Sequence, residues 1–102
     1  MERAALPMVQ QIEDLLAEAA PALADVENTL TEGYAEALQL EAQAMRIERR
    51  LGEVARSATA DSAAEIRRLG ARLTHTTGDL QRLRSLLGTL NDRARSLRAA
   101  TT

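Results

Sequence analysis

The chain has 102 residues, a formal net charge of −2 and no cysteine, tryptophan or phenylalanine. This length is enough for at most one ordinary domain. The absence of cysteine excludes disulfides and thiolate metal sites. One tyrosine is the only aromatic residue, so the side chains that β-sheets use are scarce. Ala, Leu, Arg and Glu, which favour helices, are abundant. We therefore expect a single all-α domain over residues 1–102.

The first predicted element is residues 1–20, which lead into the following helix through Pro21. Apolar residues keep the same spacing on both sides of Pro21, and a proline within a helix removes one hydrogen bond and kinks the helix. We therefore expect residues 1–20 to form a Pro-kinked, helical N-terminal extension. The alternative is a separate helix that folds back and completes a three-helix bundle, because Pro7 and Pro21 both suit the first position of a helix.

Two long helices are predicted over residues 21–57 and 62–99. In both, apolar residues recur in alternating steps of four and three, a period that is typical of coiled coils. Residues 58–61 form the predicted turn, and Ser62 followed by Glu65 is the pattern of a capping box that begins the second helix. Because the turn is short, the two helices should be antiparallel neighbours. The expected fold is an antiparallel two-helix coiled-coil hairpin.

The register of the hairpin follows from its turn, since facing residues should have numbers that add up to about 120. This pairs Gly33 with Leu87, a small residue with a large one, as a tightly packed seam requires. Residues 1–45 contain nine acidic residues and one arginine, whereas residues 46–102 contain six acidic residues and twelve arginines. The register explains this uneven charge, because it sets the acidic residues of 25–41 beside four arginines, Arg82, Arg84, Arg93 and Arg95.

A second row of apolar residues lies beside the seam on the first hairpin helix. One interpretation is that its alanines only favour the helix and that a single exposed Leu or Met needs no function. The other is a contact surface, because two helices alone bury only one narrow seam. We predict that this row, with two leucines that widen the seam, contacts a second copy of the chain or another coiled-coil protein. The predicted partner-binding residues are Tyr34, Ala35, Leu38, Ala42, Met45, Leu15 and Leu86.

The sequence offers little for catalysis. His75 is the only histidine, so no second imidazole or thiolate can join it in a metal site or a nucleophilic triad. Acidic pairs such as Glu13 and Asp14 are expected to form a hydrated helix face, because no Glu-x-x-His motif accompanies them. We predict no catalytic, cofactor-binding or metal-binding residue and no small-molecule substrate.

Seven arginines near the predicted turn suggest an alternative function, nucleic-acid binding. They are Arg46, Arg49, Arg50, Arg56, Arg67, Arg68 and Arg72. Acidic residues interrupt this cluster, and it contains no aromatic side chains on which bases could stack. Nucleic acid is therefore not the expected partner.

The location and the leading function follow from the remaining features. No apolar run approaches the roughly 20 residues of a membrane span, and residues 1–16 do not have the apolar core of a signal peptide, so we expect a cytoplasmic protein. No motif ties the sequence to a specific family. The pattern predicts a non-enzymatic protein–protein interaction module, a small coiled-coil assembly or adaptor subunit that acts through helix–helix packing.

Overall fold

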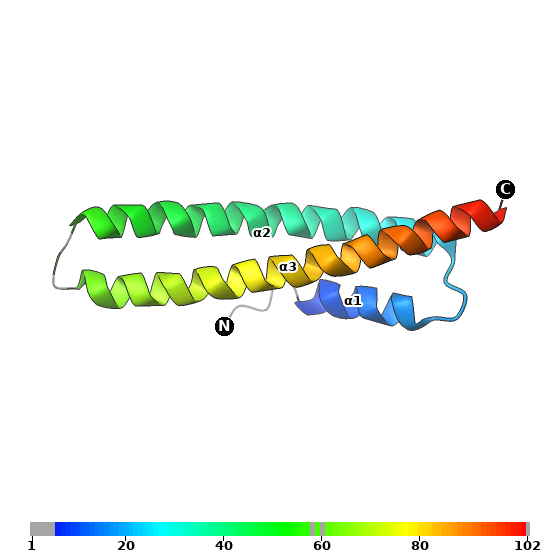
Figure 1. Cartoon of the computed structure of the whole chain (residues 1–102), viewed down its shortest axis with the longest axis horizontal. Coiled ribbons are helices and arrows are strands. Elements are labelled where there is room, and N and C mark those ends of the chain that lie inside the picture. The colour runs from blue at the N-terminus through cyan, green and yellow to red at the C-terminus, as the bar shows by residue number, and fades with distance from the viewer. Residues whose placement is uncertain (1–5, 58, 60, 102) are drawn as a thin grey trace.

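The computed structural model describes residues 6–57, 59 and 61–101 of the chain. These residues form three helices and no strand: α1 (Leu6–Ala17), α2 (Leu23–Ser57) and α3 (Ser62–Thr101). The molecule is a rod that measures 63 × 20 × 15 Å (Figure 1). The expected all-α fold is confirmed.

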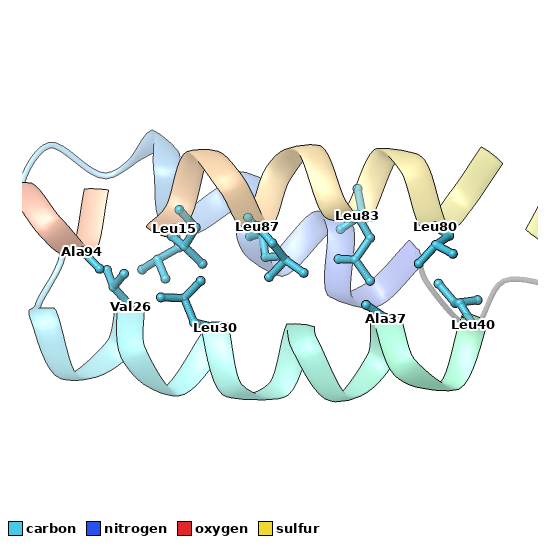
Figure 2. Packing of buried hydrophobic residues seen from close by; sticks show 12 residues of the cluster. Leu15, Val26, Leu30, Ala37, Leu40, Leu80, Leu83, Leu87 and Ala94 are labelled. Carbon is cyan, nitrogen blue, oxygen red and sulfur yellow. The ribbon is translucent and has the colours of Figure 1, made fainter. Parts of the chain in front are cut away.

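The two long helices, α2 and α3, run antiparallel and pack against each other along the rod (Figure 1). Their buried apolar residues follow the predicted steps of four and three residues, as Figure 2 shows for the part of the seam beside α1. On α2 these residues are Val26, Leu30, Ala37, Leu40, Ala44, Ile47 and Val54, and on α3 they are Leu69, Leu80, Leu83, Leu87, Leu90 and Ala94. The predicted seam therefore matches the buried face of each helix.

The predicted register is confirmed where it is most constrained, at Gly33. A Cβ atom added to Gly33 would lie 2.5 Å from Leu87 Cδ2 and 3.6 Å from Ile12 Cδ1. Leu87 is only 1% exposed, so its side chain has little room to move aside. Glycine is needed here because α2 and α3 approach too closely for a larger residue.

Ion pairs beside the seam agree with the same register. Arg98 Nη2 lies 2.9 Å from Glu27 Oε2, and Arg84 pairs with Glu41, as expected for arginines beside the acidic part of α2. Arg95 instead lies 4.0 Å from Asp92 on its own helix. The expected neighbours of Arg82 and Arg93 also differ, because both arginines contact the N-terminal segment.

The N-terminal segment does not continue α2 as a kinked extension, so that prediction is wrong. Helix α1 ends at Ala17, and the next helix begins only at Leu23. Between them the chain reverses around the buried Pro21, and α1 lies back alongside α2 and α3 (Figure 1). Three helices therefore lie side by side at one end of the rod and two at the other.

Apolar packing and two polar contacts from α3 hold α1 against the long helices. Val9, Ile12 and Leu15 are buried in the same core as Leu83 and Leu87, and complete burial of one such side chain is worth about 1.5–3 kcal/mol. These polar contacts come from two arginines of α3. Arg82 pairs with Glu13, and Arg93 Nη2 donates to the carbonyl oxygens of Glu18 and Ala19 at 3.4 and 3.0 Å. A cation at the C-terminal end of a helix satisfies exposed carbonyls and complements the helix dipole.

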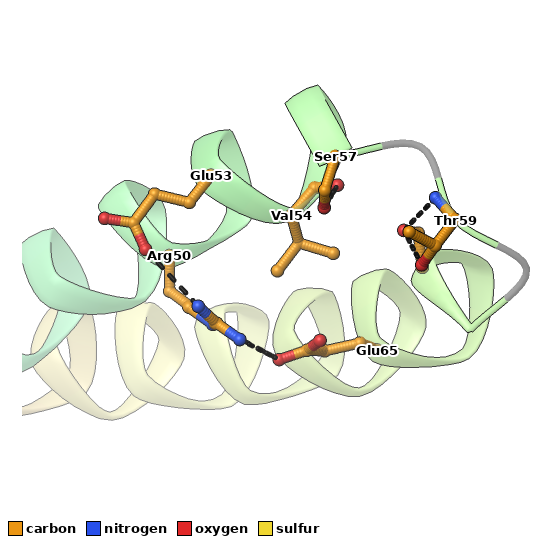
Figure 3. A network of polar contacts seen from close by, with 7 residues as sticks. Arg50, Glu53, Val54, Ser57, Thr59 and Glu65 are labelled. Carbon is orange, nitrogen blue, oxygen red and sulfur yellow. Dashed lines mark hydrogen bonds and ion pairs between the residues drawn. The ribbon is translucent and has the colours of Figure 1, made fainter.

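The second hairpin helix begins at Ser62 as predicted, but its first turn is bonded differently from a capping box. Ser62 Oγ accepts the backbone N–H of Thr59 at 2.8 Å (Figure 3), and the backbone N–H of Glu65 donates to the carbonyl oxygen of Asp61. The Glu65 carboxylate binds Arg50 on α2. Ser62 therefore stabilises the preceding turn, and Glu65 joins the two long helices.

Replacing Gly33 with Leu should overpack the seam and lower the free energy of unfolding by about 1–3 kcal/mol, although Leu has the better helix propensity. Gly78→Ala is the matched control, because an added Cβ there meets nothing within 4 Å, and it should raise stability by up to about 1 kcal/mol. Urea denaturation measures both. A Gly33→Leu variant more stable than the parent would contradict the close approach at Leu87.

Candidate interaction surface

Three of the four large apolar side chains that are exposed among the described residues lie on one side of α2, and the fourth is Ile66 of α3, at 36%. Tyr34 is 48% exposed, Leu38 66% and Met45 59%. Residues four and seven apart on a helix lie on the same side, so these three form one row, with the exposed Ala35 and Ala42 beside it. We call these five residues the α2 flank. Their predicted position outside the seam is confirmed, whereas their predicted role in binding stays a prediction.

The α2 flank is exposed because α1 packs on the other side of the seam. The contacts of α2 with α1 include Gln11 Nε2 donating to Glu32 Oε1 at 3.1 Å. Along the helix, Glu32 and the buried Thr29 precede the seam residue Gly33, whereas Tyr34 follows it. At 100° per residue, Glu32 and Thr29 lie on one side of the seam and Tyr34 lies on the other. Helix α1 therefore covers one side of the hairpin and leaves the α2 flank uncovered.

A groove of about 400 Å³ runs between the α2 flank and α3. It is lined by Tyr34, Ala37, Leu38 and Glu41 of α2 and by Arg84, Leu87 and Gly88 of α3. The Glu41–Arg84 ion pair borders it, and the absence of a side chain at Gly88 keeps it open. A Cβ atom added to Gly88 would meet nothing within 4 Å.

Gly88 is a part of this surface that sequence reasoning missed. The register that sets Gly33 opposite Leu87 also sets Tyr34 next to Gly88, so the signal was present in the pattern. The apolar spacing by itself does not mark the position, because a glycine has no side chain and Gly88 lies one residue beyond the seam residue Leu87. The structure places Gly88 at the open edge of the seam.

Two of the predicted partner-binding residues lie elsewhere. Leu15 is 7% exposed and belongs to the core, and Leu86 is half-buried against the same core. Both lie where α1 folds back against the long helices, and the predicted extension would have left that region open. Leu15 and Leu86 therefore pack within the chain and do not belong to the α2 flank.

A hollow of about 630 Å³ lies between α1 and α2. Its lining is mainly polar: Pro7, Gln10, Gln11, Asp14, Leu15, Glu18, Asp25, Asn28, Thr29 and Glu32. Ligand pockets are usually concave and largely apolar, with a few convergent polar groups. This hollow is instead polar and acidic.

The arginines near the turn are partly engaged with carboxylates. Arg50 Nη2 donates to Glu65 Oε2 at 3.0 Å, and Arg50 Nη1 donates to Glu53 Oε1 at 3.4 Å (Figure 3). The hydrogen bond to Glu65, followed by its charge and by the contact with Glu53, raises the pKa of Arg50 above its ordinary value. A hollow of about 230 Å³ also gathers Arg46, Arg50 and Arg72. This cationic surface contains no aromatic side chain.

The remaining candidate groups offer no assembled site. His75 Nε2 lies 3.6 Å from Asp79 Oδ2, one turn away on the surface of α3. Within residues 6–57, 59 and 61–101, no three His, Cys, Asp or Glu side chains come together so that they could hold a metal ion. In the same part of the chain, no helix has the length and apolar character needed to cross a bilayer.

Comparison with protein-family models, curated proteins and solved structures finds no match to this chain. The side chains described above are therefore the basis for a functional proposal. Of the described surfaces, the α2 flank and its groove combine exposed apolar side chains with a shaped recess.

Replacing Leu15 and Leu38 with Ala, one at a time, should distinguish a buried side chain from an exposed one. Leu15→Ala should lower the free energy of unfolding by about 2–5 kcal/mol, because it leaves a cavity among buried residues. Leu38→Ala should change it by less than about 0.5 kcal/mol at a protein concentration low enough to prevent association. Urea denaturation of both variants provides the measurement. Equal losses would mean that the two leucines have the same burial.

Proposed function

We propose that this protein is a non-enzymatic protein–protein interaction module, a small coiled-coil assembly or adaptor subunit that acts through helix–helix packing. The observation that carries the proposal is the α2 flank, where Tyr34, Leu38 and Met45 are about half exposed or more on the uncovered side of the hairpin. Contiguous apolar surface beside a groove is typical of interaction sites. We place this activity in the cytoplasm, a reducing compartment with which a cysteine-free chain is compatible.

The limited core of the hairpin supports the same proposal. Beyond the N-terminal end of α1, α2 and α3 are the described helices that pack together (Figure 1), and the core there is the small cluster of Ile47, Val54 and Leu69 with the half-buried Leu51 and Leu73. The buried residues keep the spacing of a coiled-coil seam, and such helices commonly associate further into bundles. A partner helix on the α2 flank would bury apolar surface that the chain leaves in water.

The experiment that tests this function changes both Leu38 and Met45 to Glu. Glu is a good helix former and both positions are exposed, so helix content by circular dichroism should stay nearly unchanged. Assembly should be lost, because burying an unpaired carboxylate in an apolar interface is strongly unfavourable. Sedimentation should show a smaller species, or a co-purifying protein identified by mass spectrometry should disappear.

The matched variant changes two seam residues, Leu40 and Ile47, to Glu. Leu40 is 3% exposed and Ile47 4%, so this variant should lose helix content along with assembly. If the Leu38 and Met45 variant kept both the mass and the partners of the parent, the α2 flank would be ordinary surface and the proposed function would be wrong.

Nucleic-acid binding is the second candidate, and the observation in its favour is the hollow that gathers Arg46, Arg50 and Arg72. A phosphate-binding surface would give an affinity that falls steeply as salt rises. We expect no such binding, because Arg50 is held by Glu65 and Glu53 and aromatic side chains for base stacking are missing from this surface. Titration of labelled single- and double-stranded oligonucleotides at low and high salt provides the check. Salt-dependent binding that Arg46→Gln and Arg72→Gln abolish would favour this candidate instead.

A further inference from the structure

We infer that the α2 flank binds the same flank of a second copy of this chain, with the two α2 helices antiparallel about a two-fold axis near residue 40. This inference rests on the proposed function and names its partner. In a two-fold interface the same patch is used by both copies, so the patch must contain both a projection and the recess that receives it. The α2 flank has both features.

The projection is Met45, and the recess is the groove beside Tyr34 and Gly88. Met45 is 59% exposed, and the groove has a volume of about 400 Å³ with Ala37 and Leu87 in its lining. Tyr34 and Met45 are separated by three helical turns, about 16 Å along α2. When two such helices lie antiparallel, Met45 of each copy reaches the groove of the other. Methionine is well suited to this role because its flexible side chain adapts to irregular gaps.

The position of this pair along α2 favours full overlap of the two rods. The midpoint between Tyr34 and Met45 is near residue 40, and residue 40 is also the midpoint of α2, which spans Leu23–Ser57. With a two-fold axis at this point, the two rods lie side by side over their full length. A face measuring 63 × 20 Å is large enough for the roughly 800 Å² that each partner contributes to a standard interface.

The charge distribution selects the antiparallel arrangement. The end of the rod that contains α1, residues 6–41 and 80–101, has nine acidic residues and five arginines. The end that contains the hairpin turn, residues 42–79, has seven arginines and five acidic residues. Antiparallel copies set the acidic end of each molecule beside the arginine-richer end of the other, whereas parallel copies set like charges together. Such complementarity favours one orientation over the other.

Gly88 gives this arrangement an additional basis. Glycine within a helix costs about 1 kcal/mol relative to alanine, and no described residue requires it here, because an added Cβ would meet none of their atoms within 4 Å. At Gly33, by contrast, the added atom would collide with Leu87. Gly70 and Gly78 are equally open, but Gly88 is the one of the three that lines the groove beside Tyr34, so its open space offers room for a side chain of the second copy.

Cysteine pairing tests the register directly, because the chain has no cysteine of its own. An equimolar mixture of a Tyr34→Cys variant and a Met45→Cys variant, refolded together and oxidised, should give a covalent dimer on a non-reducing gel. Either variant alone should not, because in the antiparallel register the two equivalent thiols lie about 16 Å apart along the helices. Efficient pairing within one variant alone would overturn the antiparallel register.

Sedimentation of the purified chain tests the partner. The parent should have twice the monomer mass of 11.1 kDa, and Gly88→Leu, which fills the groove, should weaken the dimer at least tenfold while keeping its helix content. Gly78→Leu is the matched control, since Gly78 is equally open but is absent from the lining of the groove, and it should keep the parent's mass. An unaffected dimer in the Gly88→Leu variant would overturn the role of the groove.

Failure of this inference differs from failure of the proposed function. A parent that stays monomeric at every concentration would overturn association with a second copy. The interaction function would still hold if the variant with both Leu38 and Met45 changed to Glu lost a distinct protein that binds the parent. If that variant behaved in every respect like a monomeric parent, both would fall.

Discussion

The contact between Gly33 and the side chain of Leu87 determines how the three helices fit together. Leu87 occupies the space that a Cβ atom on Gly33 would need, and Ile12 of α1 approaches the same position within 3.6 Å. One residue from each helix therefore meets at a single point, and close-packed interiors tolerate little adjustment there. Sliding α2 along α3 by one helical turn would set Leu87 against a larger residue, so this contact fixes the register of the whole rod.

The register in turn decides which surfaces remain in water. It brings Arg84 to Glu41 and Arg98 to Glu27 on one side of the seam, and it leaves the other side free for α1. Because α1 covers only one side of the hairpin, no described segment covers the apolar residues at the opposite edge of α2. The exposure of Leu38 and Met45 is thus a consequence of where α1 lies, as well as of their own position on the helix.

Most of the hairpin could be predicted from the sequence, because a buried strip along two helices imposes a spacing that the apolar residues must follow. The reversal before α2 could not. The apolar spacing around Pro21 is the same for a kinked helix and for a helix that folds back, and periodicity does not distinguish them. The contacts that decide the outcome, such as Arg93 with the carbonyl oxygen of Ala19, join residues 74 positions apart. The exposed position of Leu38 could be predicted because it follows from the spacing along α2 alone. The burial of Leu15 could not, because it depends on how α1 folds back.

Symmetry is the physical reason why so small a surface can suffice for the proposed self-association. Complete burial of an apolar side chain is worth about 1.5–3 kcal/mol, and Tyr34 and Met45 are already partly hidden within the chain, so each has less than this to gain. Association costs about 4–15 kcal/mol in lost translational and rotational freedom. Burial of Tyr34, Leu38 and Met45 from one copy alone would offset little of this cost. A two-fold axis makes every contact occur twice for a single such cost. A patch that is insufficient against an unrelated flat surface can therefore hold two copies of the same rod together, and its free energy stays small enough for the assembly to depend on concentration.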